Sequence, residues 1–248
     1  MTAKTIACIP LFLLLLVNGC RNQLLPSRYV CLLDISASIY PEAVRDEFAA
    51  MDELADRLHR GDQLIIIPIT GNARTDVQGH IVRLTAPSQR EAYDSDLTAY
   101  RQQAHAEIAS LRDWAMSHPG AHTDILGTLE VAQQEIGPDS LNVKLILLSD
   151  FLEDDGRLNF VADKDLGSIP FARHLAGSVR FEPQMQCSSV FLGHLRSRDG
   201  EGLSLSRLDA VDAFWDEFLK LPNQQTRIHT DGIGALTASV ENSDMIEH

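Results

Sequence analysis

Residues Asp34, Ser36 and Ser38 stand at alternating positions directly after an apolar run, Tyr29–Leu33. Side chains two residues apart in extended backbone point to the same side, so a carboxylate and two hydroxyls can meet one point. Hard oxygen donors of this kind suit Mg²⁺ or Mn²⁺ better than soft metals. The same residues also fit a turn that caps a helix beginning near Pro41. At this point the sequence leaves both interpretations open.

Two further polar clusters could complete a cation site. Thr123 and Asp124 lie in a loop before a predicted helix, and Ser149 and Asp150 end the apolar run that begins at Val143. The carboxyl ends of adjacent parallel strands meet at one sheet edge, where α/β proteins bind ligands. An unpaired carboxylate at a buried strand end is costly, which favours a functional role for Asp150. Thr123 could also be the N-cap of the helix that follows it.

The elements that would position these residues alternate between buried strands and amphipathic helices. Continuous apolar runs are typical of parallel strands buried on both faces. They predict strands at 29–35, 63–69, 143–149 and 189–195, and a short edge strand at 80–84. Helical spacing predicts helices at 41–59, 97–117, 125–136 and 208–219. This order predicts an α/β fold, a doubly wound and mostly parallel sheet flanked by helices, of Rossmann-like type.

The three clusters, in this order, resemble the metal-ion-dependent adhesion site of the von Willebrand factor type A family, which integrin inserted domains share. The family pattern of DxSxS, then Thr, then Asp is matched by DISAS, HTD and LILLSD, and the resemblance covers about residues 29–221. It implies an Mg²⁺ or Mn²⁺ site with these ligands, direct or through water: Asp34, Ser36, Ser38, Thr123 and Asp150. We expect Asp124 to cap the helix or orient the loop beside that site.

The resemblance implies a protein-binding module and not an enzyme. With only two carboxylates among its ligands, the metal could accept a Glu or Asp carboxylate from a partner protein. The sequence contains no GxSxG, Gly-rich phosphate loop or HExxH motif, so no catalytic residue is expected. Two alternatives stay open. One is a structural envelope scaffold with a vestigial metal site, and the other is a Mg²⁺-dependent hydrolase.

The chain departs from the family pattern after the strand-terminal aspartate. Phe151 follows Asp150, where the family often has glycine. The acidic run Glu153–Asp155 comes next and could repel an acidic ligand, bind a second cation or point into solvent. We interpret this run as a solvated loop. His122, beside Thr123, is interpreted as a loop residue and not as a ligand.

The N-terminal segment has the features of a bacterial lipoprotein signal. One Lys is followed by an apolar stretch of about 15 residues, which is short for a membrane-spanning helix, and the segment ends in LVNGC. We therefore predict a signal peptide at 1–19 and lipidation of Cys20 on an anchored tether at 20–27. The type A-like domain is predicted at 28–222, followed by a tail at 223–248 with one further strand at 226–230. These features predict a location in the bacterial cell envelope. The residue after Cys20 is Arg21 and not the Asp that the lipoprotein resemblance associates with inner-membrane retention, so an outer-membrane location facing the periplasm is expected over the inner membrane. A plain secretory signal or an N-terminal anchor stays the alternative.

Charge and cysteine content narrow the function further. The formal net charge is -14, from 21 basic and 35 acidic residues, which argues against binding of DNA or RNA through their phosphates. Cys31 lies within an apolar strand and is expected to be a small buried side chain. An exported compartment permits disulfides, so pairing of Cys31 with Cys187 stays open.

Overall fold

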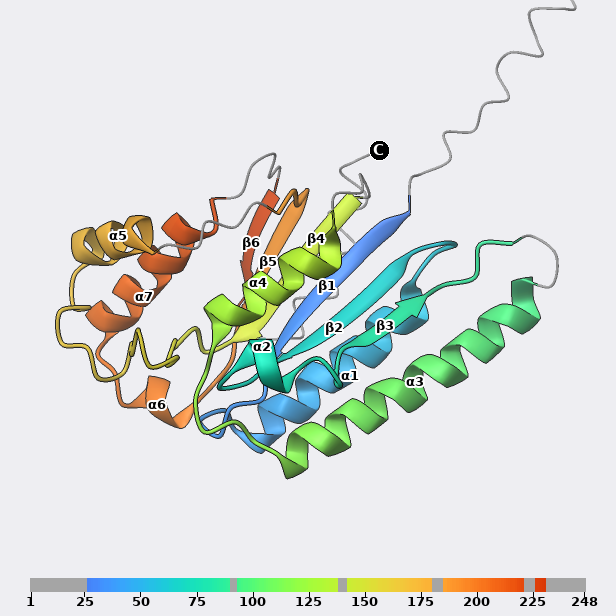
Figure 1. The fold of residues 1–248 in the computed structure, drawn as a ribbon, viewed down its shortest axis with the longest axis horizontal. Helices are drawn as coiled ribbons and strands as arrows, with labels where there is room; N and C mark the ends of the chain where they lie inside the picture. The colour runs from blue at the N-terminus through green and yellow to red at the C-terminus, as the bar shows by residue number, and fades with distance from the viewer. Residues whose placement is uncertain (1–25, 90–92, 138–141, 180–184, 221–225, 231–248) are drawn as a thin grey trace, which may run out of the picture.

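The computed structural model describes residues 26–89, 93–137, 142–179, 185–220 and 226–230. The described strands form one sheet in the order β3-β2-β1-β4-β5-β6 (Figure 1). All neighbouring strands pair in parallel except β3, which is antiparallel to β2 at the edge. The strands are β1 (Ser27–Asp34), β2 (Gln63–Ile69), β3 (Val82–Thr85), β4 (Asn142–Ser149), β5 (Ser189–His194) and β6 (Thr226–Thr230). The predicted α/β fold class is confirmed.

Helices cover both faces of this sheet. In Figure 1, α4 lies across one face, and α1 and α3 run side by side along the other. The helices are α1 (Pro41–Arg57), α2 (Ala73–Asp76), α3 (Tyr93–Ser117), α4 (Ile125–Ile136), α5 (Ile169–Ser178), α6 (Arg198–Glu201) and α7 (Leu205–Phe218). None of these described helices is long and apolar enough to cross a membrane.

The central strand β1 is buried on both faces, which explains its unbroken apolar sequence. Val30 and Leu32 belong to the core under α4 and α7, whereas Cys31 and Leu33 belong to the core under α1 and α3. Cys31 is therefore a buried side chain, as predicted. It is not paired with Cys187, because both thiols are free and buried.

The sheet order places a topological switch point between β1 and β4. The chain proceeds from β1 to β2 on one side, and β4 then adds to the opposite side of β1. Leu33 of β1 is in register with Leu148 of β4, so the residues after both strands leave the sheet at one edge. Open α/β sheets bind ligands beyond the carboxyl ends of their strands at such a switch point.

Several segments differ from their predicted form. The segments 71–79 and 151–186, for which the sequence predicts no helix or strand, contain the short helix α2 and the helix α5, respectively. The predicted tail strand exists as β6 and pairs with β5. The predicted signal peptide, Cys20, the greater part of the tether at 20–27 and residues 231–248 lie outside the described residues.

Candidate metal centre

Asp34 lies at the centre of the candidate site, at the end of β1. Its side chain is fully buried. One carboxylate oxygen accepts a hydrogen bond from the Ser149 hydroxyl at 2.6 Å, and the other accepts one from the Ser36 backbone N–H at 2.9 Å. The Ser149 hydroxyl also accepts from the Phe151 N–H at 2.9 Å. The strand-terminal residues of β1 and β4 are thus joined through one serine.

The structure brings Ser36, Ser38 and Asp150 together beside Asp34. The Ser36 and Ser38 hydroxyls are 3.0 Å apart, and the Ser38 hydroxyl lies 3.5 Å from Asp150 Oδ2, across 112 positions of sequence. The other oxygen of Asp150 accepts from the Leu152 N–H at 3.0 Å. Four of the five predicted ligands therefore lie in one continuous set of contacts at the switch point.

Thr123 is placed near this set through its backbone. Its N–H and C=O pair with the backbone of Asp154 at 3.2 and 2.8 Å. The same loop contacts the β1 end, because the Ala37 N–H donates to the Gly120 C=O at 2.8 Å. Thr123 is buried, but within the described part of the chain its hydroxyl makes no hydrogen bond to Asp34, Ser36, Ser38 or Asp150. Its role as a ligand stays a prediction.

Asp124, and not Thr123, is the N-cap of α4. Its carboxylate accepts from the Gly127 N–H at 2.7 Å and from the Ala73 N–H at 3.2 Å. The expectation that Asp124 caps the helix is confirmed, and the alternative of a Thr123 cap is wrong. Gly127 permits this geometry, because a Cβ there would lie 2.2 Å from Asp124 Oδ2.

Burial raises the pKa values of both aspartates in the centre. Loss of solvent raises the pKa of Asp150 to about 7, helped by the negative charge of Asp34 and opposed by a hydrogen bond from Ser197. The pKa of Asp34 is also raised by burial, against the hydrogen bonds of Ser149 and Ser36. Two buried carboxylates that each favour a proton form a site where a cation could replace protons.

Glu47 adds a third buried acid close to this centre. It lies on α1 with no exposed surface, and neither of its carboxylate oxygens makes a hydrogen bond within the described part of the chain. Burial raises its pKa well above the ordinary value, and the charge of Asp34 raises it further. Sequence reasoning missed Glu47, because it occupies an ordinary polar position of an amphipathic helix.

Phe151 occupies a position that suits glycine. Its φ of 63° lies in the left-handed region, which costs an ordinary residue about 1–2 kcal/mol. The residue is held there by its contacts: its ring packs 4.6 Å from that of His194, and its C=O accepts from Trp215 Nε1 at 2.8 Å. The departure from the family's glycine therefore keeps the backbone conformation that glycine would favour.

The acidic run after Phe151 is not the solvated loop that the sequence predicts. Glu153 is fully buried and the Asp155 side chain is 3% exposed, whereas the Asp154 side chain is 28% exposed. Asp154 pairs with His122 at 2.8 Å, so His122 is an exposed loop residue, as interpreted. The prediction is wrong for Glu153 and Asp155 because this loop folds back onto the start of α4, as the bonds of Glu153 to Ile125 and Leu126 indicate.

The loop after β5 forms the rim of the centre beside Ser38. The Arg198 N–H donates to the Ser38 C=O at 2.9 Å, and its guanidinium donates to the Ala37 C=O at 2.6 Å. Ser197 is buried and also donates to Asp150. Sequence reasoning missed both residues. The cap of α6 by Ser197 is a local signal, but its contact with Asp150 depends on the order of β4 and β5.

Comparison with solved structures finds chains of similar fold. They include a von Willebrand factor type A protein from Catenulispora acidiphila (16% identity, covering 86% of this chain and 41% of that chain, TM-score 0.43). A manganese-loaded TRAP protein from Plasmodium vivax is 12% identical over 86% of this chain and 71% of that chain, with a TM-score of 0.41. The minor pilin PilB from Streptococcus sanguinis is 11% identical over 89% of this chain and 61% of that chain, with a TM-score of 0.48.

The matched region is less than half of the first of these chains. No family model matches the sequence. No curated protein matches it.

Proposed function

We propose that this chain is a cation-dependent protein-binding module with a von Willebrand factor type A-like domain. The observation that carries this proposal is the convergence of Asp34, Ser36, Ser38 and Asp150 at the switch point between β1 and β4. Together with Thr123, these residues would hold Mg²⁺ or Mn²⁺ as a metal-ion-dependent adhesion site.

The donor chemistry supports a hard cation. All five side chains offer oxygen, and hydroxyl and carboxylate oxygens are the ligands that Mg²⁺ accepts while keeping some of its water. The contacts that hold Asp34 come from a hydroxyl and a backbone N–H, and those of Asp150 from hydroxyls and a backbone N–H. A divalent cation would neutralise this buried pair, which otherwise carries a desolvation cost.

The partner would supply a Glu or Asp carboxylate to the metal. Arg198 is exposed at the rim, beside Ser38, with its guanidinium 5.5 Å from the centre of the Tyr40 ring. A fixed cation next to the metal would attract an acidic side chain and would disfavour a basic one. The positive charge of Arg198 is local, because the chain has a net charge of -14 and the neighbouring Asp199 also acts on Asp150.

We place this module in the bacterial cell envelope, anchored by a lipid on Cys20 and more readily at the outer than the inner membrane. The support is the LVNGC ending of the apolar leader, followed by Arg21. Cell fractionation tests this: the wild-type chain should sediment with membranes and take up labelled fatty acid. Cys20→Ala should abolish the label, and a labelled Cys20→Ala chain would contradict the anchor.

Mg²⁺ and Mn²⁺ titration by calorimetry tests the metal centre. We expect the purified full-length chain to bind one such ion that both Asp34→Ala and Asp150→Ala abolish. Asp113→Asn, on the exposed side of α3, is the matched control and should bind as the wild type does. Circular dichroism should show each variant folded.

The partner is tested by presenting acetate and then Asp- or Glu-containing peptides to the metal-loaded chain. Binding that requires metal, and that Arg198→Glu weakens, would support a protein-binding module. A folded chain that binds neither ion, with or without acetate, would overturn the proposal and favour the scaffold. Turnover of a phosphate ester that depends on Asp34 would favour the hydrolase.

A further inference from the structure

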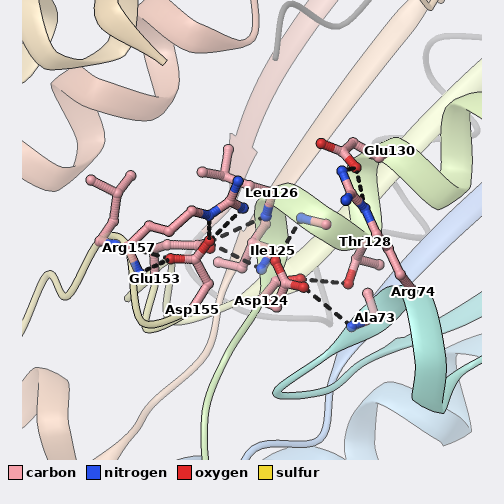
Figure 2. A network of polar contacts seen from close by, with 12 residues as sticks. Ala73, Arg74, Asp124, Ile125, Leu126, Thr128, Glu130, Glu153, Asp155 and Arg157 are labelled. Carbon is pink, nitrogen blue, oxygen red and sulfur yellow. Dashed lines mark hydrogen bonds and ion pairs between the residues drawn. The ribbon is translucent and has the colours of Figure 1, made fainter. Parts of the chain in front are cut away.

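A second group of carboxylates lies beside the candidate centre, at the start of α4. Oxygens of Asp124, Glu153 and Asp155 lie within 4.8 Å of one another. Figure 2 shows these side chains gathered at the N-terminal end of α4, where the loop after β4 meets the loop before the helix. The three residues come from segments about 30 positions apart, and only the fold brings them together.

Backbone N–H groups hold each of the three carboxylates in place. Glu153 Oε2 accepts from Ile125 and Leu126 at 3.0 and 3.3 Å. Asp155 Oδ1 accepts from the N–H groups of residues 157 and 158 at 2.8 and 2.9 Å. Asp124 accepts from those of residues 127 and 73. The oxygens are therefore preorganised, because fixed backbone groups set their positions before any ligand arrives.

One oxygen of this group has no partner. Glu153 Oε1 is shielded from solvent and makes no hydrogen bond with any described residue. Buried polar atoms almost always make a hydrogen bond. A buried carboxylate oxygen without one costs a large desolvation free energy. This orphan oxygen belongs to the most deeply buried member of the cluster, and it is the observation that points to a missing ligand.

The local charges also favour the binding of a cation. Arg157 pairs with Asp155 through Nε at 2.6 Å, so one of three negative charges has a basic side chain as its partner. The partial positive charge at the start of α4 faces Glu153 and offsets about half a charge. Burial, together with the charges of Asp124 and Asp155, raises the pKa of Glu153 well above its ordinary value, so the cluster favours a positive charge that a proton or a divalent ion could supply.

We propose that Asp124, Glu153 and Asp155 bind a second divalent cation, of which Ca²⁺ is the best fit. Ca²⁺ binds about six to eight oxygens in a flexible geometry, whereas Mg²⁺ requires a near-octahedral arrangement that side chains fixed by backbone N–H groups cannot readily adjust to. Ca²⁺ also accepts several carboxylates in one site, and Mg²⁺ more often keeps waters. This site uses none of the five residues of the first centre and does not depend on it.

The second ion would fix the loop that carries the predicted ligand Thr123. Asp124 is the next residue along the chain, and the backbone of Thr123 pairs with that of Asp154, between Glu153 and Asp155. An ion bound by Asp124, Glu153 and Asp155 would therefore join the two strands of this small bridge. It would act as a structural ion, held by side chains that have little solvent contact.

Calorimetric titration of Ca²⁺ into the purified full-length chain tests this site. The experiment uses a background in which Asp34→Asn and Asp150→Asn remove the first centre. We expect this background chain to bind one Ca²⁺, and the further change Glu153→Gln to abolish binding. Asp154→Asn, in the same loop with its carboxylate paired to His122, is the matched control and should keep the ion.

Thermal unfolding separates loss of the ion from loss of the fold. Glu153→Gln can still accept the N–H groups of Ile125 and Leu126, so it should unfold in EDTA at or above the wild-type temperature. Added Ca²⁺ should raise the midpoint of the wild type but not that of Glu153→Gln. Absence of Ca²⁺ binding by the folded background chain would overturn the site in favour of a shared proton, and binding that survives Glu153→Gln would overturn the ligand set. Loss of Mg²⁺ binding at the first centre alone would leave this inference intact.

Discussion

Two carboxylate clusters lie at the same edge of the sheet, and different groups hold them. In the first, Asp34 and Asp150 are contacted mainly by serine hydroxyls, from Ser149, Ser38 and Ser197. In the second, Glu153 and Asp124 are contacted by backbone N–H groups. Hydroxyls can rotate and can themselves bind a metal, whereas backbone N–H groups only fix the acceptor. The first arrangement suits an ion that exchanges ligands, and the second suits a structural ion that remains bound.

The segment that joins the two clusters should give the largest effect. Phe151 is fully packed, so Phe151→Ala should lower the free energy of unfolding by about 3–5 kcal/mol. Because its φ is 63°, Phe151→Gly should be less destabilised than Phe151→Ala by about 1 kcal/mol, although it removes more side chain. Urea unfolding of both variants measures the difference. An alanine variant more stable than the glycine variant would show that the conformation carries no strain.

The first cluster shows what spacing can predict. Alternation by two in DISAS and the buried strand ending at Ser149 suffice to place Asp34, Ser36, Ser38 and Asp150 at one edge, because parallel strands end together. Helix α4 was also predicted with its observed bounds, since its apolar spacing and its preceding polar residue are both local signals.

The second cluster shows which contacts the spacing of residues in the sequence does not predict. Three acids in a row predict solvent exposure, and the burial of Glu153 arises only because the loop folds onto the first turn of α4. Ser197 and Arg198 are likewise brought to the rim by the position of β5 next to β4. Sequence reasoning missed these contacts because they depend on the order of the strands in the sheet and not on the residues nearby in the sequence.

Removal of the Ser149 hydroxyl should affect the first cluster and spare the second. Ser149→Ala leaves the Phe151 N–H and one Asp34 oxygen without their hydrogen bond, which should cost about 1–3 kcal/mol of unfolding free energy. Because this hydroxyl orients Asp34, Mg²⁺ affinity should fall about 10–100-fold while Ca²⁺ binding at the second cluster is unchanged. Urea unfolding and calorimetry measure the two effects.

Ser189→Ala is the matched control for this change. Ser189 is a buried serine of the neighbouring strand β5 whose hydroxyl makes no hydrogen bond among the described residues. Its removal should leave stability nearly unchanged and should not alter Mg²⁺ affinity. Equal destabilisation by the two alanine variants would mean that the cost comes from packing and not from the hydrogen bonds of Ser149.

The effect of Glu47 differs from the others because it depends on pH. Burial first, and the charge of Asp34 second, raise the pKa of Glu47 well above its ordinary value of 4.5. The folded chain therefore keeps a proton that the unfolded chain releases once the pH exceeds that value. Since the native state then binds more protons, its unfolding free energy falls as pH rises through this window, by up to about 1.4 kcal/mol per pH unit for one group.

Glu47→Gln should remove this dependence on pH. Urea unfolding in EDTA should therefore show the variant becoming more stable than the wild type, by a difference in unfolding free energy that grows from pH 4.5 toward pH 8. Glu53→Gln, on the exposed side of the same helix, should follow the wild-type curve.

Mg²⁺ at the first cluster would neutralise Asp34 and thereby remove the second cause of the raised pKa of Glu47. The ion should therefore reduce the difference in unfolding free energy between wild type and Glu47→Gln. Ca²⁺ at the second cluster should leave that difference unchanged, because among the described residues Asp34 is the charged group that raises the pKa of Glu47. A Glu47 effect that responded equally to both ions would mean that the two clusters are one electrostatic unit and not two separate sites.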